Sequence, residues 1–153
     1  MKHKFYGKDG VIMIGIILAS HSNLSKGVRD AMNCIMGEQD KVKALSLNVA
    51  DDINKFAPLI AETVDEMDNG EGVLIFADLL GGSPCNQSGK LLTSKNVKIV
   101  TGLNLPMLFA AIEARSQGMD LDSTAQYSIE SAINGIQNLE TVLTMNKNQK
   151  GGN

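Results

Sequence analysis

Short apolar runs alternate along the chain with longer segments in which apolar residues recur three or four positions apart. The short runs predict buried strands over residues 12–19, 42–49, 72–77 and 97–101. The longer segments predict helices over residues 24–36, 53–67, 105–115 and from about 122 onward. Because strands and helices alternate, the pattern predicts an α/β fold. We expect one doubly wound, mostly parallel sheet of about four strands with helices on both faces.

Residues with strong preferences for helix ends lie between these segments. Asp51 or Asp52 is expected to cap the helix over residues 53–67. Pro58 lies inside that helical pattern, which predicts either a kink or a later start. After the third strand, Pro84 suits a first helical turn and Ser83 suits the capping position before it.

The chain divides into one domain and two ends. Residues 13–145 are expected to form the domain, without an internal linker or repeat. Residues 1–12 are interpreted as a leader or a non-native extension, and residues 146–153 as a polar, flexible tail. Residues 141–144 have strand-like character, so a short strand is expected over residues 140–145.

Composition and charge exclude several classes of function. The net charge is −3, which is not the basic composition of a protein that binds nucleic acid. Cys34 and Cys85 lack a metal or redox spacing and are interpreted as reduced thiols of a cytosolic protein. His3 and His21 are the only histidines, so neither a metal nor another cofactor is expected. The longest apolar run, residues 11–19, is too short to cross a membrane, and the protein is expected to be cytoplasmic.

Unusual residues follow the strands that the pattern predicts. His21 comes two residues after the first strand, and Asp78 comes directly after the third. The fourth strand is followed by the turn of residues 101–106. Because the carboxyl ends of parallel strands lie at one edge of a sheet, His21 and Asp78 can converge if their strands are neighbours.

These residue types suit phosphoryl transfer without a metal. A neutral His21 beside a helix N-terminus is a nucleophile in a setting that attracts anions. Asp78 can fix the tautomer of the imidazole and stabilise the positive charge that develops on it. The backbone N–H groups of Gly81 and Gly82, with the hydroxyl of Ser83, can hold phosphate oxygens.

Three segments resemble the IIA component of the mannose family of the bacterial sugar phosphotransferase system. They are MIGIILASHSNLSKG, GVLIFADLLGGSPCNQS and VTGLNLPMLFAAIEAR, and the similarity extends from about residue 13 to about residue 138. The resemblance implies that His21 is phosphorylated, with Asp78 as the carboxylate beside it and Ser83 as the serine that contacts the phosphate. It implies that HPr, the phosphocarrier protein, donates the group and a IIB component accepts it. Membrane components IIC and IID would take part indirectly. It also implies a homodimer in which the strand over residues 140–145 is exchanged between subunits.

Other functions remain open at this stage. The phosphotransferase subunit of dihydroxyacetone kinase uses a similar domain with a histidine after its first strand. A hydrolase with His21, Asp78 and Ser83 as a triad has the right residue types, although Ser83 lacks the surrounding motif of a nucleophile elbow. An aspartate-phosphorylated receiver-like module would share the sheet, but it needs an acidic pair where this chain has Ser20 and His21.

Overall fold

A parallel sheet of four strands forms the centre of the protein, as the alternation predicted. The structure, a computed structural model, describes residues 13–150. The strand order is β2-β1-β3-β4, and all neighbours run parallel. The strands are β1 (Gly15–His21), β2 (Val42–Leu47), β3 (Val73–Ala77) and β4 (Val97–Thr101). β1 and β3 are therefore neighbours, which is the condition for His21 and Asp78 to meet.

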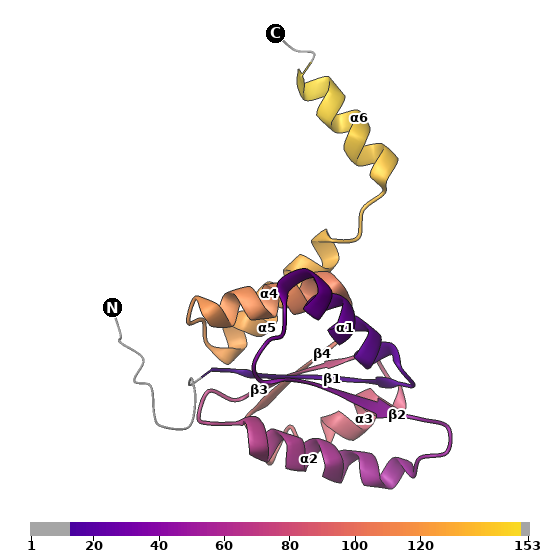
Figure 1. Ribbon diagram of the computed structural model, residues 1–153, viewed down its shortest axis with the longest axis vertical. Helices are drawn as coiled ribbons and strands as arrows, with labels where there is room; N and C mark the ends of the chain where they lie inside the picture. The colour runs from indigo at the N-terminus through magenta and orange to yellow at the C-terminus, as the bar shows by residue number, and fades with distance from the viewer. Residues whose placement is uncertain (1–12, 151–153) are drawn as a thin grey trace.

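Helices cover both faces of the sheet (Figure 1). One face carries α1 (Leu24–Met36), α4 (Leu105–Ser116) and α5 (Leu121–Asn134). The other carries the short 3-10 helix η1 (Ile53–Lys55), α2 (Phe56–Met67) and α3 (Ser83–Gly89). Because β1 and β3 are covered on both sides, their side chains alternate between two separate apolar cores, with Ile16 in one and Ile17 in the other.

The register brings the carboxyl ends of three strands to one edge of the sheet. Ala19 of β1 is paired with Ala77 of β3, which is paired with Thr101 of β4. β1 continues beyond this level, so that His21 is paired with Leu47 at the end of β2. His21 therefore projects from the middle of the edge at which all four strands end.

Of the two expected helix caps, the one at Asp51 or Asp52 is present before η1, and the one at Ser83 is not. Asp52 caps η1 by accepting a hydrogen bond from the backbone N–H of Asn54. α2 begins at Phe56, so Pro58 lies in its first turn and the later start is confirmed. The expectation for Ser83 as a cap is wrong, because α3 begins at Ser83 itself and Gly82 occupies the capping position. Pro84 does lie in the first turn of α3, as expected.

The segment after α5 is a helix where a strand was expected. Residues 140–145 lie within α6 (Leu139–Lys150), which extends away from the domain (Figure 1). Asn138 starts this helix: its side chain accepts from the backbone N–H of Glu140, and its carbonyl accepts from that of Val142. A lone strand would leave its backbone groups unpaired, whereas a helix pairs them within the segment. The strand over residues 140–145 is therefore corrected to a helix, and the exchange between subunits stays a prediction.

The expected ends of the chain are only partly described. α6 includes residues 146–150 of the expected tail. Residues 151–153 and the expected leader at residues 1–12 lie outside the described residues. No helix within residues 13–150 is both long and apolar enough to cross a membrane.

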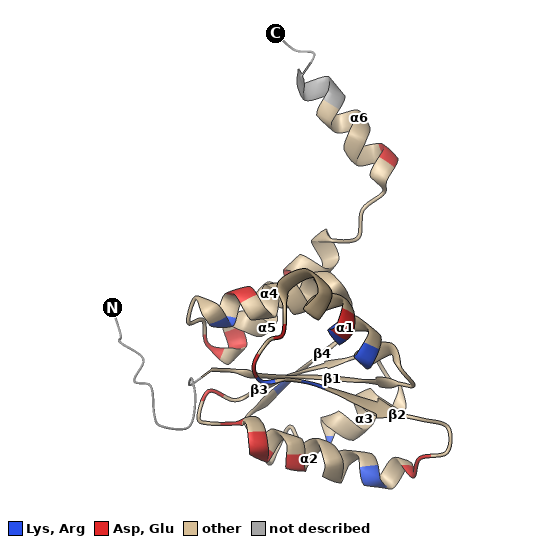
Figure 2. Ribbon diagram, viewed as in Figure 1, with Lys and Arg blue, Asp and Glu red and all other residues tan. Residues whose placement is uncertain are grey.

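Charges of both signs are interspersed over the described residues (Figure 2). Basic and acidic side chains are paired at the surface in Arg29–Asp30, Lys43–Glu66, Lys95–Asp65 and Lys98–Asp122. Exposed pairs of this kind contribute little to stability. Their effect here is to leave the described surface with mixed charge.

Candidate functional site

His21 is the residue at which β1 changes from buried to exposed. The preceding residues of the strand are all buried, whereas the His21 side chain is 49% exposed. The chain then turns sharply: Ser22 has a φ of 49°, and its N–H donates to the carbonyl of Leu47. The buried strand therefore anchors the backbone of His21 while its imidazole faces outward.

Asp78 holds His21 through both the ring and the backbone. Its Oδ2 lies 2.8 Å from Nδ1 of His21 and accepts a 2.8 Å hydrogen bond from the backbone N–H of the same residue. Its other oxygen, Oδ1, accepts from the N–H of Leu79 at 2.8 Å. The Asp78 side chain is only 9% exposed. The convergence expected from the order of the motifs is therefore present in the structure.

These contacts decide the charge of Asp78 and the tautomer of His21. Burial raises the pKa of Asp78, but hydrogen bonds from the His21 backbone and ring and from Leu79 outweigh it, so the pKa lies below its ordinary value. Asp78 is thus ionised at neutral pH, and its oxygens can only accept hydrogen bonds. Nδ1 of His21 must then carry the proton. In a neutral imidazole Nε2 then carries the lone pair, and within residues 13–150 it makes no hydrogen bond.

The two glycines of the turn have different physical requirements. Gly81 has a φ of +80°, which disfavours any other residue. Gly82 has an ordinary φ of −70°, but a Cβ there would lie 3.0 Å from Cε1 of His21. The N–H of Gly82 donates to the carbonyl of Leu79, so it is already used within the turn. Among the expected phosphate-binding groups, this leaves the Ser83 hydroxyl and the N–H group of Gly81.

A groove of about 430 Å³ opens beside the imidazole. His21, Ser22 and Ser83 line one part of it. The rest is lined by Asn48, Val49 and Asp51 of the loop between β2 and η1, and by Leu47 and Ile53 at the two ends of that loop. The sequence motifs did not reveal this loop, because they lie at the ends of β1, β3 and β4. The loop follows β2, and it can be assigned to the site only when β2 is known to be the neighbour of β1.

A backbone N–H group at the N-terminus of α1 is already hydrogen-bonded to a side chain of the protein. The hydroxyl oxygen of the buried Ser20 accepts the backbone N–H of Ser25 at 2.7 Å. The hydroxyl of Ser25 in turn donates to the carbonyl of Leu45. One of the N–H groups expected to attract an anion beside His21 is therefore satisfied, and these serines instead join β1, α1 and β2.

The turn after β4 supports the site but does not line the groove. Asn104 caps α4 by accepting the N–H of Met107 at 3.0 Å. The N–H of Leu103 donates to the carbonyl of Ala77, next to Asp78. Within the described part of the chain, no group of three or more His, Cys, Asp or Glu residues is placed to hold a metal ion.

Comparison with known proteins gives matches along most of the domain. The model of the family EIIA-man, described as "PTS system fructose IIA component", matches residues 15–129. The chain is 23% identical over 128 residues to the PTS system mannose-specific EIIAB component of Escherichia coli (strain K12). That alignment covers 83% of this chain and 40% of the relative, so the chain spans less than half of that protein. The PTS system sorbose-specific EIIA component of Lacticaseibacillus casei is 28% identical over 106 residues, which is 68% of this chain and 76% of that protein.

Solved structures match over a similar extent. The phosphotransferase system component EIIA from Streptococcus agalactiae has a TM-score of 0.77 and 30% identity, covering 84% of this chain and 99% of that one. The PTS IIA protein associated with the fucose utilization operon of Streptococcus pneumoniae has a TM-score of 0.72 and 30% identity. It covers 84% of this chain and 95% of that one. The residues that the family model matches include His21, Asp78 and Ser83.

Proposed function

We propose that this chain, which belongs to the EIIA-man family of phosphotransferase-system components, carries a phosphoryl group on His21 from one protein to another. The resemblance seen in the sequence is thereby confirmed at the level of the family. The donor in this proposal is the phosphocarrier HPr, and the acceptor is a IIB component. The membrane components IIC and IID take part indirectly in coupled sugar uptake. Such a carrier works in the cytoplasm, where its partners are.

The contact between Nδ1 of His21 and Asp78, at 2.8 Å, carries the proposal. With the proton held on Nδ1, the lone pair on Nε2 attacks the phosphorus of the donor. The bond between phosphorus and the donor breaks as the bond to Nε2 forms, and the electron pair of the broken bond returns to the donor. His21 becomes positively charged during this step, and the ionised Asp78 stabilises that charge.

The remaining groups of the site are suited to position the phosphoryl oxygens. Phosphoryl transfer requires mainly positioning and stabilisation of charge, rather than covalent chemistry from the protein. The Ser83 hydroxyl lines the same groove as His21 and lies at the start of α3. We propose that this hydroxyl and the N–H group of Gly81 contact the phosphoryl oxygens.

The assay for this function is phosphorylation of the full chain by HPr, the general enzyme I and phosphoenolpyruvate. The chain should gain about 80 Da, the mass of one phosphoryl group, in a form that is labile in acid and stable in base. His21→Ala should abolish the gain, and His3→Ala is the matched control that should retain it. Undiminished labelling of His21→Ala contradicts the proposal.

The other functions that the sequence left open gain no support. The match to the EIIA-man family favours a phosphotransferase component over a receiver-like module. The mannose-specific and sorbose-specific relatives favour a sugar phosphotransferase system over the subunit of dihydroxyacetone kinase. For a hydrolase, the Ser83 hydroxyl would have to transfer its proton to Nε2 of His21. Within residues 13–150, no hydrogen bond joins these two groups.

We also expect the protein to form a homodimer through its C-terminal segment. Ile136, Leu139 and Leu143 are 75%, 70% and 53% exposed, although they are large and apolar. Ile136 precedes α6, whereas Leu139 and Leu143 lie in it. All three are more than half exposed on their own domain, and a second copy of the chain would cover them.

A further inference from the structure

We propose that Asn86 is a positioning residue, which holds the glycine pair of the turn against His21 and thereby fixes the imidazole. The inference rests on the proposed function and adds a residue to the machinery of that site. Asn86 is an exposed residue of α3, and its side-chain amide donates a hydrogen bond to the carbonyl of Gly81 at 3.0 Å.

Asn86 binds both carbonyls of the glycine pair. Its side chain holds the carbonyl of Gly81, and its backbone N–H donates to the carbonyl of Gly82 at 2.9 Å. Of the two ends of an asparagine amide, only the NH₂ group can donate to a carbonyl oxygen. A substitution that removes this NH₂ group therefore breaks the first hydrogen bond and keeps the second, which belongs to the backbone.

The peptide between Gly81 and Gly82 is held at both of its polar groups. Its carbonyl accepts from Asn86, and its N–H donates to the carbonyl of Leu79 at 3.0 Å. Because a peptide unit is planar, two hydrogen bonds at its opposite sides define its orientation. Glycines restrict the rotation of such a unit less than other residues do, so the pair depends on these hydrogen bonds to stay in place.

The glycine pair in turn limits the position of the imidazole. A Cβ at Gly82 would lie 3.0 Å from Cε1 of His21, so the backbone there is next to the ring. Cε1 adjoins both Nδ1, which contacts Asp78, and the attacking Nε2. Ser83 follows Gly82 and lines the groove with His21. A displaced pair would give the ring room to rotate away from Asp78, and it would move the Ser83 hydroxyl relative to Nε2.

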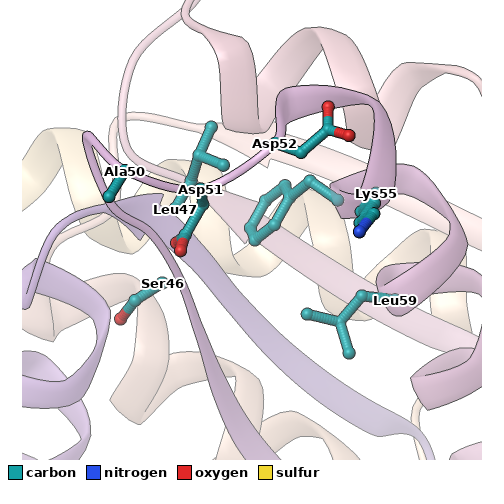
Figure 3. Close-up of a pocket in the computed structure, with 8 residues that line it drawn as sticks. Ser46, Leu47, Ala50, Asp51, Asp52, Lys55 and Leu59 are labelled. Carbon is teal, nitrogen blue, oxygen red and sulfur yellow. The ribbon is translucent and has the colours of Figure 1, made fainter.

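Asn86 lies outside the hollows near His21, so its effect has to pass through the turn. It does not line the groove beside the imidazole. The neighbouring hollow, of about 460 Å³ between the end of β2 and the start of α2, is lined by other residues, among them Ser46, Asp51 and Leu59 (Figure 3). Replacing Asn86 therefore removes no group that faces these hollows.

The test compares two phosphoryl donors on the full chain. Asn86→Ala removes the amide, and Asn86→Asp keeps the size of the side chain without its donor. Asn33→Ala is the matched control, because Asn33 is an asparagine of α1 that lines a different hollow and not the groove beside His21. One donor is phosphorylated HPr, and the other is phosphoramidate, a small reagent that phosphorylates imidazole and releases ammonia.

Both Asn86 variants should lower kcat with phosphorylated HPr by about threefold to tenfold at an unchanged KM, the range that one hydrogen bond between neutral groups corresponds to. Their reaction with phosphoramidate should slow by the same factor, because the change concerns His21 and not the donor. The ¹⁵N chemical shifts of the imidazole should show a smaller population with the proton on Nδ1. Asn33→Ala should match the wild type in all three measurements.

A double variant tests whether Asn86 acts through the glycine pair. Gly82→Ala brings a Cβ against the ring, and its effect depends on the pair being held in place. Loss of the Asn86 amide frees the pair to recede, so Gly82→Ala combined with Asn86→Ala should react no more slowly than Gly82→Ala alone. Independent effects would multiply, and a double variant slowed by the full additional factor of Asn86→Ala would overturn the proposed route.

Two other results would overturn the proposal and leave the function of His21 intact. One is a wild-type kcat and tautomer in Asn86→Ala. The other is a raised KM for HPr with a normal rate for phosphoramidate, which would make Asn86 a docking contact. Failure of the wild type to be labelled on His21 would instead contradict the proposed function, and the imidazole shifts of Asn86→Ala would still decide whether Asn86 positions the ring.

Discussion

Replacing Gly82 by alanine tests whether the glycine-rich turn positions the imidazole of His21. The backbone of Gly82, at φ −70° and ψ 160°, suits alanine, so the change introduces no backbone strain. The new Cβ would lie 3.0 Å from Cε1 of His21 and 3.2 Å from the carbonyl oxygen of Leu79. Carbon atoms in contact lie about 3.5–4.0 Å apart, so the half-exposed ring must give way by a few tenths of an ångström.

Such a movement weakens the hydrogen bond between Nδ1 and Asp78, which is 2.8 Å long in the structure. A hydrogen bond to a charged group contributes about 1.5–3 kcal/mol. If it stabilises the transition state to that extent, its loss slows phosphorylation of His21 by roughly 10- to 100-fold. The free energy of unfolding should fall by only about 1 kcal/mol or less, because alanine is a poorer capping residue than glycine.

The assay is the rate of phosphorylation by phosphorylated HPr, followed by the mass of the intact chain after rapid quenching. Gly89→Ala is the matched control, because it lies in α3 and its new Cβ would meet no atom within 4 Å. The ¹⁵N chemical shifts of the imidazole report the tautomer directly, and only Gly82→Ala should shift the population away from protonated Nδ1. The reasoning is refuted if Gly82→Ala reacts within about twofold of the wild type and keeps the wild-type tautomer.

Three further predictions concern the carboxylate and the assembly. Asp78→Asn keeps the size of the side chain but removes its charge, so transfer through His21 should slow by about 100-fold or more; a rate within about twofold would show that another group orients the ring. Folding lowers the pKa of Asp78. The contribution of the ionised carboxylate to the free energy of unfolding is therefore complete above the unfolded-state pKa of about 3.9, and it is lost as the pH falls through the lower folded-state pKa. The free energy of unfolding of Asp78→Asn, measured by urea titration between about pH 2 and 5, should therefore depend less on pH than that of the wild type, and parallel curves would contradict this. In sedimentation, the full chain should behave as a dimer with twice the 16.4 kDa mass of the monomer, and truncation after Asn138 should weaken it; a full-length monomer at micromolar concentration would refute the expected assembly.

The local order of elements and the residue types of the site were accessible from the sequence. β3 is apolar throughout and β1 is apolar as far as Ala19, because both of their faces are covered, which makes such strands visible as runs. His21 and Asp78 were found because each lies within two residues of the end of one of these runs. Their direct contact, however, depends on β1 and β3 being neighbours, and hydrogen bonding between strands leaves no mark in the local pattern.

The segment after α5 shows where a short pattern is ambiguous. Residues 140–145 contain threonine, valine and leucine, which suit a strand, but also glutamate and methionine, which suit a helix. A strand needs a neighbour to receive its hydrogen bonds, whereas a helix needs only an adequate start, which Asn138 provides. The conformation of this segment thus depends on whether a neighbouring strand is available to it, and a local pattern does not contain that information.

The sequence by itself determined the α/β class, the four strands of the sheet with the helices between them, and the histidine and carboxylate at the edge of the sheet. Only the tertiary structure decided which nitrogen of His21 is free, why Gly82 has to be a glycine, and that the loop after β2 forms a wall of the groove. The first kind of feature follows from periodicity and backbone preference within a few neighbouring residues. The second kind arises from contacts between residues far apart in the chain, such as the 57 positions that separate His21 from Asp78. Strand order and register bring these residues together, and both are set by packing of the whole domain.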